Sequence, residues 1–135
     1  MDFDEICIMN HLKLPLTIIG LSAILTGCFN TSRNCEQCKT GKFSFSTEVG
    51  GRIETSTFVR FKDYEVEYFQ GKSDTSNIRW INDCEYILQK RNPKNRAEQQ
   101  AIHIKITKTD EMGYEFDYKA VGAEKTLKGR VNRVN

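Results

Sequence analysis

The sequence lacks the features that mark several large classes of protein. Its longest apolar run, residues 14–25, is only about a dozen residues long, whereas a helix that spans a bilayer needs roughly 20. It contains no glycine-rich loop that would cradle a phosphate, no internal repeat and no low-complexity segment. Charge of one sign does not dominate either, because 18 acidic residues nearly balance 20 basic ones. These absences argue against a membrane-spanning helix, a nucleotide-binding enzyme and a nucleic-acid-binding protein.

What the N-terminus does contain is a short apolar run that ends in Leu25-Thr26-Gly27-Cys28. A run of this length before small residues is typical of a secretory signal peptide. Its end resembles the bacterial lipobox, in which the cysteine is acylated, for example with palmitate, and the chain is cleaved before it. The resemblance predicts a signal peptide over residues 1–27, lipidation of Cys28 and a lipid-anchored protein of the cell envelope. Because Phe29 rather than Asp follows the cysteine, it also implies sorting to the outer membrane.

The first eight residues do not fit a signal peptide. They include Asp2, Asp4 and Glu5, whereas the segment before the apolar run should be net positive. A start at Met9 would place Lys13 ahead of that run instead. We therefore predict that translation begins at Met9.

The remainder of the chain alternates apolar and polar residues in short segments separated by turn residues. Such segments cover residues 43–46, 52–61, 64–69, 78–80, 84–88, 102–106, 114–120 and 125–134. About eight short strands at this spacing predict an all-β domain, with a polar tether over residues 28–41 and the domain over residues 42–135. Short loops favour an antiparallel up-and-down meander that closes into a small barrel. In the segment 64–69 the alternation places Tyr64, Val66 and Tyr68 on the face opposite Glu65 and Glu67.

Two stretches carry a resemblance to a family. These are "CEQCKTGKFSF" over residues 35–45 and "IRWINDCEYILQK" over residues 78–90, with its Trp-x-x-x-Cys-Glu-Tyr motif. Together they resemble short Gram-negative envelope lipoproteins with a lipocalin-like β fold. The resemblance implies a disulfide between Cys35 and Cys84, with Cys38 as the alternative partner of Cys84. Similar sequences are sometimes labelled DNA topoisomerase IV, which we regard as a misnomer, because the nucleotide fold and the acidic metal cluster of that enzyme are missing.

Candidate sites for catalysis or metal binding are weak. His103 is the one histidine after Cys28, and it falls on the polar side of its segment without a nearby nucleophile. The spacing of Cys35 and Cys38 is that of thioredoxin, but the pair stands before a strand rather than at the start of a helix. A zinc site would need a second close ligand pair, which is missing. We therefore expect no enzyme activity, metal or cofactor.

Two functions remain. The first is a non-enzymatic interaction or structural module that docks an envelope protein through an exposed row containing Glu65, Glu67, Arg79, Glu85 and Lys105. The alternative is a lipocalin-like carrier of a small apolar ligand. The aromatic residues expected to line its cavity are Phe43, Phe45, Tyr64, Trp80, Tyr86, Phe116 and Tyr118. The sequence does not identify the ligand, the partner or the side of the membrane that the domain faces.

Overall fold

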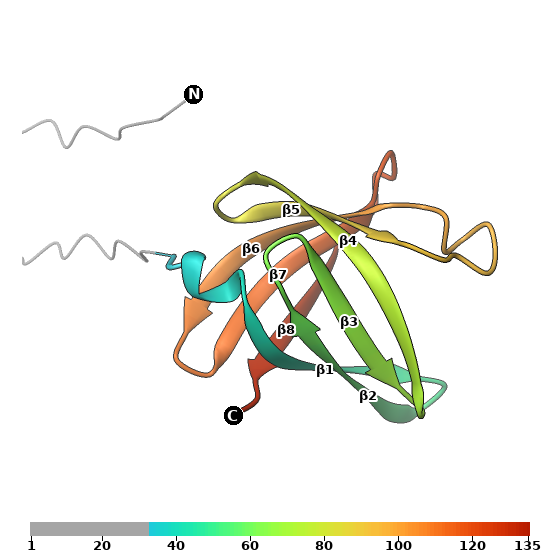
Figure 1. The fold of residues 1–135 in the computed structure, drawn as a ribbon, viewed down its shortest axis with the longest axis horizontal. Coiled ribbons are helices and arrows are strands. Elements are labelled where there is room, and N and C mark those ends of the chain that lie inside the picture. The colour runs from blue at the N-terminus through green and yellow to red at the C-terminus, as the bar shows by residue number, and fades with distance from the viewer. Residues whose placement is uncertain (1–32) are drawn as a thin grey trace, which may run out of the picture.

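A computed structural model describes residues 33–135; the predicted signal peptide, Met9 start and lipidated Cys28 lie outside this range. The described chain forms a closed barrel of antiparallel strands in which each strand pairs with the next and β8 pairs with β1 (Figure 1). The elements are η1 (Glu36–Cys38), β1 (Gly41–Val49), β2 (Arg52–Arg60), β3 (Tyr64–Phe69), β4 (Lys72–Asn82), β5 (Glu85–Lys90), β6 (Ile102–Asp110), β7 (Gly113–Ala120) and β8 (Leu127–Arg133).

The predicted fold class, an eight-stranded antiparallel meander that closes on itself, is thus confirmed. Tight turns join most consecutive strands, and glycines with positive φ supply them at Gly50, Gly51 and Gly71. The longest connection runs from Arg91 to Ala101 between β5 and β6, and it contains turns rather than a strand or a helix. Closure gives every strand of the barrel a paired neighbour on both sides, so none is a free edge strand.

One end of the barrel is closed by the segment that precedes β1. The helix η1 lies beside this end (Figure 1), and the disulfide Cys35–Cys84 ties its start to the turn between β4 and β5. Cys35 and Cys38 are both buried, so this part of the expected polar tether belongs to the core. The predicted pairing of Cys35 with Cys84 is confirmed, and Cys38 is a free, buried thiol.

Strand β3 has the opposite orientation to the one its sequence suggested. Glu65 is buried and Glu67 is half-buried, whereas Tyr68 is 50% exposed. The reason is the hairpin register, which pairs Glu65 with the buried Arg60 of β2, so both side chains point into the barrel. The expected docking row is therefore wrong in part, because two of its acidic residues lie inside the barrel.

Among residues 33–135 there is no helix with the length and apolar character needed to cross a bilayer.

Candidate functional site

The interior of the barrel contains a cavity of about 200 Å³ that is partly open to solvent. Most of its wall is apolar and comes from β1 and from strands β5 to β8: Phe45, Tyr86, Leu88, Ile102, Ile104, Tyr114, Phe116, Tyr118 and Val131. The ring of Phe116 extends over β8 at Gly129, where a Cβ atom would lie only 2.6 Å from it. The glycine thus lets the aromatic rings of β1 and β7 meet inside the barrel, with Phe45 and Phe116 5.8 Å apart between ring centres.

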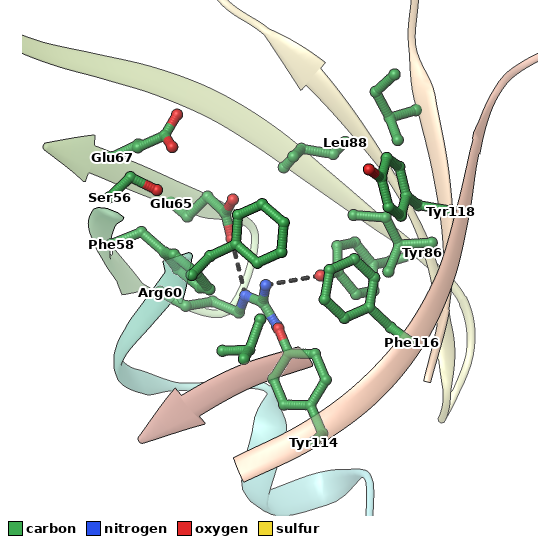
Figure 2. Close-up of a pocket in the computed structure, with 14 residues that line it drawn as sticks. Ser56, Phe58, Arg60, Glu65, Glu67, Tyr86, Leu88, Tyr114, Phe116 and Tyr118 are labelled. Atoms are coloured by element: carbon green, nitrogen blue, oxygen red, sulfur yellow. Dashed lines mark hydrogen bonds and ion pairs between the residues drawn. The ribbon is translucent and has the colours of Figure 1, made fainter. Parts of the chain in front are cut away.

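The opposite wall of the cavity is polar. Strands β2 and β3 place Ser56, Arg60, Glu65 and Glu67 there, beside the ring of Phe58. Figure 2 shows Ser56 and Glu67 on one side of the cavity and Leu88, Phe116 and Tyr118 across from them. A pocket with an apolar wall and a few polar groups on one side is the usual form of a small-molecule site.

An ion pair forms the closed end of the cavity. The Nε of Arg60 donates to Glu65 Oε2 at 2.9 Å, with Arg60 only 2% and Glu65 only 7% exposed. Arg60 also donates to the hydroxyl of Tyr86 at 2.7 Å and to the carbonyl of Cys38 at 3.0 Å. Its guanidinium lies over four aromatic rings, the nearest being that of Tyr86 at 4.7 Å from the centroid. Every one of these contacts favours the charged guanidinium, which explains how it is held inside an apolar core.

The protonation of these groups follows from their burial. Burial works against the charge of Arg60, but Tyr114, Tyr86 and Glu65 outweigh it and leave the pKa of the guanidinium above its usual value. Burial raises the pKa of the Glu65 carboxyl, and the charge of Arg60 opposes this shift. Burial also raises the pKa of the Tyr86 and Tyr114 phenols, so both stay neutral and can hydrogen-bond at physiological pH.

The aromatic residues predicted to line a cavity are only partly brought together. Four of them, Phe45, Tyr86, Phe116 and Tyr118, do line it. Phe43 points inward but is fully buried in the closed end, where its ring stacks on Phe58. Trp80 packs on Tyr86 at 4.7 Å between ring centres and donates its indole N–H to the carbonyl of Lys62.

The prediction for Tyr64 is wrong. Its ring lies on the outside of β3, stacked on Phe61 at 4.5 Å and covered by the guanidinium of Arg91 at 5.3 Å. The inverted orientation of β3 is the cause, since Tyr64 and Glu65 alternate and Glu65 occupies the inner position.

Sequence reasoning missed the polar side of the site, which consists of Ser56, Arg60, Glu65 and Glu67. A signal for it does exist in "TSTFVRF", where Phe58 and Arg60 share one face of β2 and Thr57 and Val59 share the other. The β-branched residues of this segment do not mark the interior, because they are common in strands on either face. The large aromatic side chain of Phe58 was the better guide to the interior.

Within residues 33–135 the cysteines and the histidine do not assemble a metal centre. The disulfide uses the sulfurs of Cys35 and Cys84, and no group of three His, Cys, Asp or Glu side chains suited to a metal is present in this range. His103 lies on the outer face of β6, where its Nε2 is 3.1 Å from Glu85 Oε2. Burial acts to raise the pKa of Glu85, but His103 and Lys105 outweigh it and lower that pKa overall.

A second feature is the outer surface of strands β2 to β4, which we call the neutral face. It consists of Ile53, Thr55, Thr57, Val59, Tyr64, Val66, Tyr68, Ser73, Thr75 and Asn77. No residue in this set is itself charged, and Ile53 is 71% exposed and Tyr68 50%. Two arginines border the set: Arg79 follows on the outer side of β4, and Arg91 lies over Tyr64 and donates to Asn77 Oδ1 at 2.9 Å. The outer surface of β5 to β8 instead carries Glu85, His103, Lys105, Glu115, Asp117, Lys119, Lys128 and Arg130.

Comparisons with known proteins found no relative of this chain. A scan against protein-family models, a search of curated proteins and a search of solved structures each gave no match. Any function must therefore be argued from the barrel itself.

Proposed function

We propose that this chain is a non-enzymatic binding barrel that holds one small, largely apolar ligand in its interior. The observation that carries the proposal is the cavity of about 200 Å³, with an aromatic and aliphatic wall facing a polar one. Small eight-stranded barrels have just enough interior to be filled by their own side chains, so an interior that keeps this space has room for an occupant. Pockets for drug-sized ligands span roughly 300–1,000 Å³, so the occupant is smaller than a typical drug.

The structure of the closed end supports a preformed binding site rather than a packing defect. The pair Arg60–Glu65, bound to Tyr86 and Cys38, sets a rigid polar floor beneath the cavity. No buried side-chain nitrogen or oxygen in the described part of the chain lacks a hydrogen-bond partner. A ligand would therefore enter a preorganised cavity, which limits the entropy lost on binding.

Native mass spectrometry of the exported domain, purified without denaturant, tests this function. We expect a small co-purifying mass that leaves when the protein unfolds. Ser56→Phe adds a ring on the cavity wall and should abolish that mass, whereas Thr55→Phe adds the same ring at the adjacent, exposed position and should retain it. A bare protein mass, or equal retention by both variants, would contradict the proposal.

We also propose that the barrel is held at the envelope by a lipid on Cys28, with the outer membrane as its site. The support is the lipobox-like end of the signal segment in the sequence. Metabolic labelling with a palmitate analogue should mark the protein, and Cys28→Ala should remove the label and leave the precursor uncleaved. N-terminal sequencing of that precursor would also decide between a start at Met9 and one at Met1.

A second candidate function is docking of an envelope protein on the neutral face. The exposed Ile53 and Tyr68 favour it, because large apolar side chains exposed on one face often mark interaction sites. A photo-crosslinking residue at Tyr68 should then capture a defined partner in cells. The same residue at Asp117, on the charged outer surface, is the control, and equal capture at both positions would argue against docking.

A further inference from the structure

The polar side of the cavity carries one carboxylate that has no cationic partner in the described part of the chain. Arg60 is the cation at the closed end, and it pairs with Glu65 at 2.9 Å. At the open end Lys90 lies 3.3 Å from Asp74 and 3.6 Å from Glu98. Two further lysines, Lys72 and Lys94, are exposed at the rim, and the Nζ of Lys94 approaches Asp74 at 3.9 Å. Glu67 lies between these two charged groups.

Glu67 has no ion-pair or hydrogen-bond partner among residues 33–135 within normal contact distance. It borders the interior cavity and also the two hollows at the rim, one beside Ser76 and one beside Lys72. Glu65 is the neighbour of Glu67 on the inner face of β3. The negative charge of Glu67 adds to the effect of burial in raising the pKa of Glu65. Glu67 is thus a half-buried anion at the point where the cavity meets the entrance.

The wall across from Glu67 suits the remainder of such a ligand. Leu88, Phe116 and Tyr118 face it across the cavity (Figure 2). Aromatic faces attract cations within about 6 Å, and their rings also bury apolar surface. The same interior already shows this chemistry, since the guanidinium of Arg60 lies over Phe58 and Tyr86.

We propose that the ligand is a small organic cation, an amine with an apolar or aromatic body, whose charged nitrogen binds the Glu67 carboxylate. This inference rests on the proposed ligand-binding function and specifies its substrate class. A positive nitrogen at Glu67 would neutralise the unpaired charge of the polar wall. A carboxylate ligand would meet Glu67 as a like charge, so anionic amphiphiles should bind more weakly.

Calorimetric titration with three compounds of matched body tests the preference: phenethylamine, phenethyl alcohol and hydrocinnamate, all at neutral pH. We expect the amine to bind about tenfold or more tightly than the alcohol, because only the amine adds a charge–charge attraction to the hydrogen bond with the Glu67 carboxylate. Hydrocinnamate should bind most weakly. Glu67→Gln should lower the affinity for the amine to about that for the alcohol and so remove the preference.

Glu48→Gln is the matched control, since it removes one negative charge from an exposed position of β1 outside the cavity wall. It should keep the preference for the amine. Equal binding of amine and alcohol, or a preference that survives Glu67→Gln, would overturn the inference and leave the ligand-binding function intact. Binding of none of the three compounds would also overturn the inference. The native mass measurement would then test the ligand-binding function separately.

Discussion

Two strands of this barrel have almost the same sequence pattern and opposite orientations. β3 contains "YEVEYF" from Tyr64, and β7 contains "YEFDYK" from Tyr114. In β7 the aromatic residues point into the barrel and the acidic residues point out, whereas in β3 the acidic residues point in. An alternating pattern therefore gives the two faces of a strand, but it does not say which face is inside.

Neighbouring strands decide the orientation. β7 pairs with β6, whose Ile104 and Ile106 are buried, so Tyr118 and Phe116 lie beside them on the inner face. β3 pairs with β2, whose inner face ends in Arg60. A buried guanidinium needs a counter-ion, and only the acidic face of β3 supplies one, so Glu65 turns inward and Tyr64 outward.

The largest effect should come from removing the charge that holds β3 in this orientation. Arg60→Met leaves Glu65 buried without its partner and should lower the free energy of unfolding by about 3–5 kcal/mol. Urea unfolding followed by Trp80 fluorescence would measure it. The double variant Arg60→Met/Glu65→Leu removes both charges and should recover much of the loss. A single variant as stable as the unmodified protein would mean that the ion pair does not orient β3.

Equivalent tyrosines of the two strands should differ in a direct test. Tyr114 is 1% exposed, so Tyr114→Ala leaves a cavity and should destabilise the fold by about 3–5 kcal/mol. Tyr64→Ala removes an outer ring stacked on Phe61 and should cost only about 0.5–1.5 kcal/mol. Both are measured by the same denaturant titration. Equal losses would show that β3 is oriented as the sequence pattern alone suggested.

The stability of the closed end of the barrel, where η1 lies over Arg60, should depend on the disulfide. Replacing Cys35 and Cys84 together by serine opens a loop of sequence separation 49, and the chain-entropy model predicts a loss of about 3–4 kcal/mol. Cys38→Ser tests the neighbouring thiol by itself. Burial raises the pKa of the Cys38 thiol, so it should react with a maleimide only after unfolding. Rapid labelling of the native protein would show that η1 does not stay closed over Arg60.

The smallest effect should be that of the outer ion pair between Glu85 and His103, on the charged side of the barrel. The pKa of Glu85 is lowered on folding, so its contribution is complete above the unfolded value of about 4.3 and is lost as pH falls through the folded pKa. Between pH 6 and pH 3 the unmodified protein should therefore lose more stability than Glu85→Gln, by less than about 1 kcal/mol. Unfolding titrations across this range would measure the difference. An equal pH slope for both proteins would remove any role for the pair.

Much of the fold was predictable because it depends on local patterns. Alternation between Ile102 and Ile106, and between Tyr114 and Tyr118, predicted strands that the structure contains, and glycines such as Gly50 and Gly71 marked their turns. The pairing of Cys35 with Cys84 also agreed with the expectation drawn from resemblance. The polar half of the cavity was not predictable in this way, because Arg60 and Glu67 look like ordinary surface charges in their own segments.

The sequence by itself determined that about eight strands follow one another in a meander, since this follows from side-chain alternation and from residues that favour turns over a few positions. Only the tertiary structure decided which face of β3 is inside, why Arg60 is buried and where Glu67 meets the cavity. The physical reason is that a charge becomes acceptable inside a protein only when partners from other strands surround it. For Arg60 these partners are Glu65, Tyr86 and the carbonyl of Cys38, which the closed barrel brings together.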